Sequence, residues 1–240
     1  MATIQKQLKH DRAQEVAAEA VHWSQTHRNT ILASLAGAVV LALIILGIYA
    51  YSHSQNQAAS TALGDAMRAL NSPVRQPGQP EEPNVPSFGS VQERDKAALG
   101  KFEGVASKWP HTSAGQYSIY LAGVVENDMG DLSGAEKSFQ HAREAGNHDV
   151  SSLAKVALAH LYFNSNRDAE GVKLLKDVID SPSVTVPKAS AQLELAQYYE
   201  EKNQKADAVK LYEQMQKDNA KTPIAQLSQE KVKELTGATK

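Results

Sequence analysis

The sequence contains no cysteine, so disulfides, thiolate metal ligands and cysteine nucleophiles are excluded, although an oxidising compartment is still permitted. It also has no HExxH motif, no glycine-rich phosphate loop and no nucleophile-elbow sequence, and its eight histidines are scattered. An enzyme's site would have to be built without any recognisable nucleophile, metal cluster or cofactor loop. We therefore expect no catalytic residue, no metal, no cofactor and no small-molecule substrate.

An excess of basic residues is also missing. The chain has 25 lysines and arginines against 27 aspartates and glutamates, a formal net charge of −2, and no block of basic residues. Proteins that bind nucleic acid neutralise its phosphates with lysine and arginine, so nucleic acid is not an expected partner. The pair His148-Asp149 lies in a predicted turn, where a helix that starts near Asp149 or Ser151 explains both residues.

The sequence does contain one long apolar run, from Ile31 to Tyr51, without a charge, an amide or a proline. A helix of this length rises about 30 Å, the thickness of a bilayer's hydrocarbon core. A cleaved signal peptide would have an apolar run of roughly 7 to 15 residues after a short basic segment, and a buried core helix would show a polar stripe. We predict an uncleaved transmembrane helix over residues 31–51. Ala33 and Gly37 have the spacing of helix-packing motifs, which alanine-rich spans also contain by chance.

The charges beside the span set its expected orientation, because the side richer in lysine and arginine is normally cytoplasmic. Four basic residues precede the span, namely Lys6, Lys9, Arg12 and Arg28. Counted within about twenty residues on each side, the margin is Arg12 and Arg28 against Arg68. We predict a helical, cytoplasmic juxtamembrane segment over residues 1–30 and an extracytoplasmic domain over residues 52–240.

The chain after the span changes composition twice. Residues 55–71 predict a helix that continues from the span, and residues 72–89 contain five of the nine prolines. Proline fixes φ and lacks an amide donor, so residues 72–89 are predicted to form an extended, polar loop. From Ser90 to Asn219, helical patterns alternate with short turns, without strand-like alternation. We predict an all-α domain.

The helical segments repeat at intervals of 36 and then 37 residues. In each unit a small residue is followed twelve residues later by another, and a large side chain stands four residues further on. Small residues at this offset allow two antiparallel helices to approach, and the large one fills the space against the next hairpin. The three sets are Gly123, Ala135 and Phe139; Ala159, Gly171 and Leu175; and Ala196, Ala208 and Tyr212. The pattern predicts an α-solenoid of helical hairpins.

The same positions resemble the tetratricopeptide repeat, whose pattern has leucine, then a small residue, then an aromatic residue three positions later. Two units match it, whereas the first has Glu126 in the aromatic place. The matching residues are Leu158, Ala159 and Tyr162, then Leu195, Ala196 and Tyr199. The tryptophan of the pattern is replaced by Ile119, Lys155 and Gln192. The resemblance implies repeats at about 114–147, 152–182 and 188–219.

Two flanking segments complete the expected solenoid. A split first hairpin would cover residues 55–110, with Leu63 and Gly64 in its first helix and the insertion 72–89 between its helices. A capping helix would cover residues 223–236, with charges on one side, because a solenoid must end in a polar outer face. Its apolar side would consist of Ile224, Leu227, Val232 and Leu235.

In this repeat class, fixed positions on the first helix of each hairpin line the inner face. Aromatic and aliphatic side chains interleaved with amides suit a groove for a peptide or extended segment. We predict such a groove from Tyr117, Tyr120, Val124, Asn127, His160, Phe163, Asn164 and Gln197. Part of this set is expected to be core between hairpins instead. The Lys and Asn clamp that holds a C-terminal carboxylate in some such domains is missing, so that ligand class is not expected.

The order of these features resembles the ancillary subunit of the SecYEG translocon, the YfgM-like family. The resemblance covers nearly the whole chain, and its most similar stretch is KWPHTSAGQYSIYLAGVVENDMGDLSGAEKSF. It implies a non-enzymatic protein of the bacterial inner membrane with periplasmic repeats, which acts with SecYEG and a PpiD-like periplasmic chaperone on newly exported proteins. The alternative is an envelope-biogenesis or division-linked scaffold that uses the same repeats for a different client.

Overall fold

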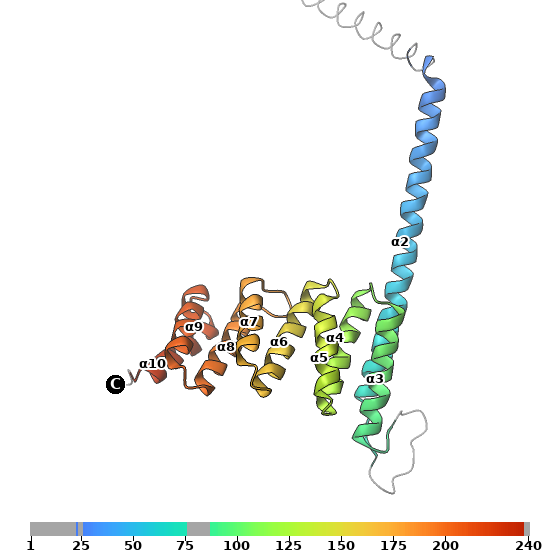
Figure 1. Ribbon diagram of the computed structural model, residues 1–240. Helices are drawn as coiled ribbons and strands as arrows, with labels where there is room; N and C mark the ends of the chain where they lie inside the picture. Colours follow the sequence, from blue (N-terminus) through green and yellow to red (C-terminus); the bar gives the residue numbers. More distant parts are fainter. Residues whose placement is uncertain (1–22, 24–25, 76–86, 238–240) are drawn as a thin grey trace, which may run out of the picture. The chain divides into compact units, whose positions relative to one another are not determined.

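The computed structural model of the 240-residue chain describes Trp23, residues 26–75 and residues 87–237 (Figure 1). Most of the predicted juxtamembrane segment, residues 1–30, lies outside this described part. The chain divides into two compact units, residues 1–54 and residues 55–240.

The first unit consists, where it is described, mainly of the beginning of one long helix, α2 (Arg28–Leu70). No glycine pair or proline interrupts this 43-residue helix. The helix therefore runs without a break from the apolar run into the more polar residues 55–70. None of its most apolar window is buried, and Leu43 and Ile48 are each 62% exposed. The length, composition and exposure of this helix are those of a membrane anchor or a signal sequence. Ala33 and Gly37 lie on this exposed part of the helix.

The second unit is a row of helices joined by short turns (Figure 1). The helices after α2 are α3 (Val91–Lys108), α4 (Ser113–Asp128), α5 (Leu132–Glu144), α6 (His148–Asn164), α7 (Asp168–Asp180), α8 (Lys188–Glu201), α9 (Lys205–Asp218) and α10 (Pro223–Thr236). Each helix from α3 to α10 packs against the next one along the chain. The described residues contain no β-strand, only an isolated bridge between Val74 and Phe88. The predicted fold class, an all-α solenoid after one apolar helix, is confirmed.

The turn inside each hairpin has the same geometry in all three repeats. Its central residue lies in the left-handed region, with φ of 83° at Gly130 and 58° at both Asn166 and Asn203. Glycine and asparagine tolerate this conformation best. In each turn the amide of the next residue donates to a carbonyl five residues earlier, which closes the first helix. These bonds are Asp131 N to Glu126 O at 2.9 Å, Arg167 N to Tyr162 O at 2.8 Å and Gln204 N to Tyr199 O at 2.7 Å.

Small residues lie where the helices come closest. Ala159 and Ala208 are fully buried. A methyl group added at Gly123 would lie 2.7 Å from the ring of Phe139, and one added at Gly171 would lie 2.4 Å from the ring of Phe163. The large residues that follow are buried as well, as Phe139 illustrates at 3% exposure. The close spacing of these helices therefore depends on glycine and alanine at the crossing points.

The hairpin before these repeats differs from its prediction in one respect. Gly64 lies in open space on α2, and Ala66, two residues later, is the fully buried small residue. Ala66 packs in one cluster with Phe102 of α3 and Val125 of α4. The two ends of the predicted loop meet in a neck, where Phe88 N donates to Pro73 O at 3.1 Å. Residues 76–86, the central part of that loop, lie outside the described residues.

Helix α10 covers the last apolar cluster of the solenoid. Ile224, Val232 and Leu235 pack against a cluster of Ala196, Ala208, Tyr212 and Met215. Leu227 was expected on the same side, but it is 39% exposed and lies outside this cluster. The next residue, Ser228, is buried instead, and its hydroxyl donates a hydrogen bond to Ile224 O at 2.7 Å.

The start of α6 agrees with the expected helix start near Asp149. The helix begins at His148, because the side chain of Asn147 accepts the amides of Asp149 and Val150 at 3.0 and 3.2 Å. Asp149 therefore has another role, and its carboxylate accepts the amides of Val184 and Thr185 at 3.0 and 3.3 Å. The cap at Asn147 starts the helix, and Asp149 ties the loop between α7 and α8 to it.

Candidate protein-binding face on α4, α6 and α8

The first helices of the three hairpins, α4, α6 and α8, carry all eight residues of the predicted groove. Four of these side chains are exposed, namely Asn127, His160, Asn164 and Gln197. The other four are half-buried, namely Tyr117, Tyr120, Val124 and Phe163. Helix α4 contacts α6 across the repeat boundary. An exposed surface with partly sheltered aromatic rings therefore exists on these helices.

A hydrogen-bonded pair joins two of these helices. His160 Nε2 of α6 lies 2.7 Å from Glu194 Oε2 of α8. This bond with the carboxylate raises the pKa of His160 above its ordinary value, burial opposes the increase, and the charges of Glu194 and Glu201 add to it. Glu194 was missed by the sequence analysis. The available signal was its 34-residue separation from His160, close to one repeat.

The charge of Glu194 also influences a tyrosine of α4. The pKa of the Tyr120 hydroxyl is raised, first by burial and then by its neighbours Tyr117 and Glu194. His160 and Glu194 therefore join two helices directly, and the charge of Glu194 also influences Tyr120 on a third. We call the surface formed by Tyr117, Tyr120, Val124, Asn127, His160, Asn164, Glu194 and Gln197 the A-helix face.

The aromatic rings on α4 connect this face to the core. Tyr117 and Tyr120 meet edge to face with their ring centroids 6.2 Å apart. Tyr120 also lies 5.8 Å from Phe139, a buried residue of α5. The Tyr120 ring therefore packs against the buried Phe139 on one side and against Tyr117 on another. Rings held in this way lose little conformational entropy when a partner arrives.

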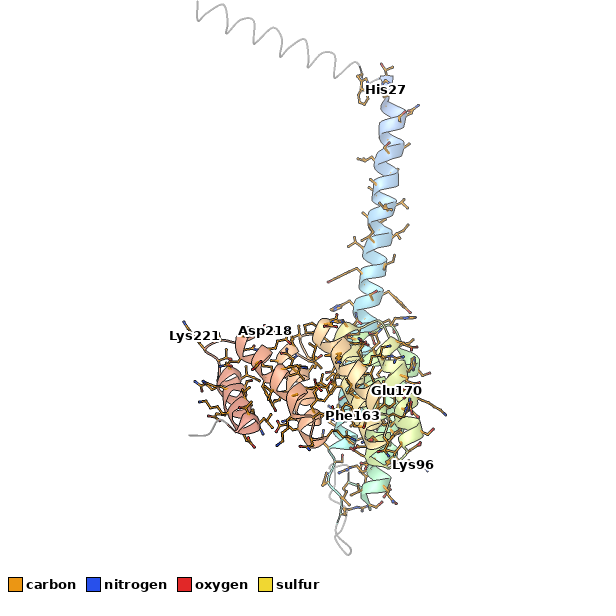
Figure 2. All side chains as sticks on the ribbon, turned by 60° about the vertical axis from the view of Figure 1, so that its left-hand side comes forward. His27, Lys96, Phe163, Glu170, Asp218 and Lys221 are labelled. Carbon is orange, nitrogen blue, oxygen red and sulfur yellow. The ribbon has the colours of Figure 1, made fainter. Side chains whose placement is uncertain are left out.

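Phe163 takes part in packing between helices, contrary to a role as an open groove residue. Its ring stacks on Tyr198 of α8 with a centroid separation of 3.8 Å and an interplanar angle of 14°. On another side, the ring lies against Gly171 of α7. Figure 2 shows the labelled Phe163 among the side chains of the repeat helices. Of the two interpretations left open for the groove residues, its geometry therefore favours core.

A second polar cluster holds neighbouring repeats together away from the A-helix face. Glu136 of α5 accepts the Tyr162 hydroxyl at 3.0 Å and Arg167 Nη1 at 2.7 Å. The Arg167 guanidinium also lies over the Tyr162 ring, 3.8 Å from its centroid, and pairs with Glu170. Each group already has partners inside the protein. This cluster is therefore an inter-repeat clamp, and its polar atoms are used in the fold.

The sequence was compared with families of known proteins and with curated proteins. Residues 21–184 match the tetratricopeptide repeat-like domain. The chain belongs to this family. The match includes α2 through α7, so it contains the apolar helix as well as the first two complete repeats. No match was found among curated proteins.

Other features of this tetratricopeptide repeat-like protein lie away from the A-helix face. An open depression of about 480 Å³ lies between the end of α2 and α3, and another of about 250 Å³ lies between α9 and α10. Neither is lined by a residue of the A-helix face. Within the described ranges, no three His, Asp or Glu side chains are grouped so that they could hold a metal ion. Repeat-like domains of this family are typically non-catalytic modules for protein interaction.

Proposed function

We propose that this protein is a membrane-anchored, non-catalytic interaction module whose A-helix face binds a partner protein. The single observation that supports this face is the hydrogen bond between His160 and Glu194, which joins α6 and α8 on a surface that also includes the half-buried tyrosine rings of α4. Supported aromatic rings beside hydrogen-bonding groups are characteristic of protein interfaces. The exposed apolar helix supplies the anchor, since about 20 apolar residues suffice to cross a bilayer.

We propose the following arrangement in the cell. Residues 1–30 are cytoplasmic, residues 31–51 cross the inner membrane of a bacterium, and residues 52–240 lie in the periplasm. The excess of lysine and arginine before the span supports this orientation. The order of features shared with YfgM-like proteins supports a position beside the SecYEG translocon, where a PpiD-like chaperone would act on the same emerging proteins.

The orientation is tested with reporter fusions to the full chain. A reporter that is active only outside the cytoplasm should be active after Lys240 and inactive after Ala2. A cleaved signal sequence would release the Lys240 fusion from membranes, which fractionation would detect. Reversed activities would place the repeats in the cytoplasm and would contradict the proposed site at the translocon exit.

The binding face is tested by site-specific photocrosslinking in intact membranes. A crosslinking residue is introduced at Asn164 or Gln197, which are exposed on the A-helix face, and at Glu213, an exposed position on α9. Crosslinks to translocon or chaperone subunits from the first two positions, and not from Glu213, are the expected result. Equal yields from all three positions would contradict a specific role of this face.

A further inference from the structure

The A-helix face contains a carboxylate, Glu194, that is only partly covered by its hydrogen-bond partner. The Glu194 side chain is 31% exposed, so it is open to a partner on the side not taken by His160. On the same helix, Lys202 is paired with Asp168 of α7 at 2.9 Å. In the cap, Lys231 is paired with Glu200 at 3.0 Å. Both lysines therefore already have a carboxylate partner.

A second carboxylate adds to the negative potential at this place. Glu201 of α8 is exposed, and its charge is one of the causes of the raised His160 pKa. Even when His160 carries its proton, the two carboxylates Glu194 and Glu201 outnumber it, so this part of the face attracts a positive group and repels a negative one. An acidic or phosphorylated segment is disfavoured here, and a basic one is favoured.

The two tyrosines of α4, one of which is influenced by the charge of Glu194, suit the same kind of group. Tyr117 and Tyr120 are both half-buried and meet edge to face, which fixes the direction of their ring faces. A guanidinium or ammonium group is attracted to the face of an aromatic ring within about 6 Å of its centroid. A carboxylate next to such a ring adds a charge-assisted hydrogen bond. One lysine or arginine side chain can use both interactions together.

We propose that the A-helix face binds an extended polypeptide segment through a lysine or arginine that docks against Tyr117 and Tyr120 and pairs with Glu194. This proposal rests on the proposed function and names the chemistry of its partner. Helix α4 contacts α6, and side chains of α6 and α8 meet at His160 and Glu194, so at about 8–10 Å per neighbouring helix the three helices offer a face on the order of 20 Å. About six extended residues cover that length. The amides of Asn127, Asn164 and Gln197 are then available to the backbone of the segment.

The test is a selection of random octapeptides on the full-length protein in lipid nanodiscs. The wild type should enrich lysine and arginine over aspartate and glutamate, and Glu194→Gln should abolish this enrichment. Glu213→Gln, an exposed and isosteric change on α9, should keep it. Unchanged helical content and melting temperature establish that both variants are folded.

A selected peptide then provides a quantitative test. Replacing its basic residue by the uncharged analogue citrulline or norleucine should weaken binding to the wild type about tenfold, and should have little effect on binding to Glu194→Gln. Tyr117→Leu should also weaken binding severalfold, whereas Tyr117→Phe, which keeps the ring, should not.

The outcomes separate this inference from the function on which it rests. Enrichment of basic residues that persists in Glu194→Gln, or enrichment of acidic residues by the wild type, would overturn the inference and leave a peptide-binding face. Retention of no peptide by any variant would overturn both the inference and the proposed binding function.

Discussion

Three glycines in the repeats lie where a side chain has no room. A methyl group at Gly115 would lie 1.9 Å from the backbone oxygen of Trp109, and those at Gly123 and Gly171 would meet aromatic rings. Other helical glycines, such as Gly104 of α3, have nothing within 4 Å of the same position. Replacing glycine by alanine should therefore lower stability at the crowded positions and raise it at the open ones. The difference depends on the neighbouring helix, which the local sequence does not show.

We expect Gly123→Ala to lower the free energy of unfolding by about 1–3 kcal/mol, because the new methyl group overlaps the buried Phe139 ring. Gly104→Ala should raise it by about 0.5–1 kcal/mol, because alanine is the better helix former and the space is open. Denaturant unfolding of the full chain in detergent micelles measures both changes. The opposite ranking would show that α4 and α5 do not approach each other as described.

His160 makes one contribution to stability depend on pH. Its bond to Glu194 raises its pKa in the folded state above the unfolded value. Such a group stabilises the fold fully below its unfolded pKa, and the contribution is lost as the pH rises through the folded pKa. We therefore expect the melting temperature of the wild type to exceed that of His160→Gln most at low pH.

This difference should shrink between about pH 5 and about pH 8, the range in which histidine normally loses its charge. Thermal melting at several pH values measures it. His141→Gln, at an exposed position on α5, serves as the matched control. A difference for His160→Gln that is independent of pH would contradict the pairing with Glu194.

The element that repeats is a hairpin of two helices with a left-handed turn residue and a close helix crossing. Asn166 and Asn203 adopt the same φ of 58°, and the turns that contain them close with the same backbone hydrogen bond. Between hairpins, polar clamps such as Glu136 with Arg167 fix one repeat on the next. Because each hairpin contacts only its neighbours, stability is a sum over hairpins and their interfaces.

The crossing of α8 and α9 can be tested with one pair of variants. Ala208→Leu should lower the free energy of unfolding by about 1–3 kcal/mol or more, because Ala208 is fully buried between the helices. Ala206→Leu, on the same helix but exposed, should change it by less than about 0.5 kcal/mol. Equal effects in denaturant unfolding would mean that the assigned register of α9 is wrong.

The whole molecule combines an apolar helix and a solenoid that are covalently continuous through α2. Residues 55–240 form a compact unit of their own, and they include both partners of a hydrogen bond from Trp109 Nε1 to Gln55 Oε1 at 2.7 Å. The large apolar side chains of residues 32–51 are exposed, whereas those of the solenoid are mostly buried. The helix that is long and apolar enough to cross a membrane therefore begins in the first unit.

Removal of residues 1–54 should give a soluble and fully helical protein with cooperative thermal unfolding, because no core residue of the solenoid is lost. Sedimentation with liposomes and far-UV circular dichroism measure the two properties. Persistent sedimentation of this fragment with liposomes would reveal a second membrane-binding surface. Loss of helicity would show that the apolar helix is needed for folding.

The sequence alone was sufficient for features that depend on local patterns. An uninterrupted apolar run determines a helix long enough to cross a bilayer, and small residues twelve positions apart determine paired helices with a repeat of 36 or 37 residues. These signals lie within one element or one hairpin, where periodicity alone identifies the inward side. The same reasoning identified α4, α6 and α8 as the helices that carry the candidate face.

Only the tertiary structure decided which side chains on those helices meet. Phe163 has the periodicity of a groove residue but stacks on Tyr198, and Leu227 has that of a core residue but is 39% exposed. The bond between His160 and Glu194 joins separate hairpins. Helical periodicity identifies a broad face, whereas contacts at its edge depend on the rotation and crossing of neighbouring helices. That rotation is set by packing across repeat boundaries, which no single segment of the sequence contains.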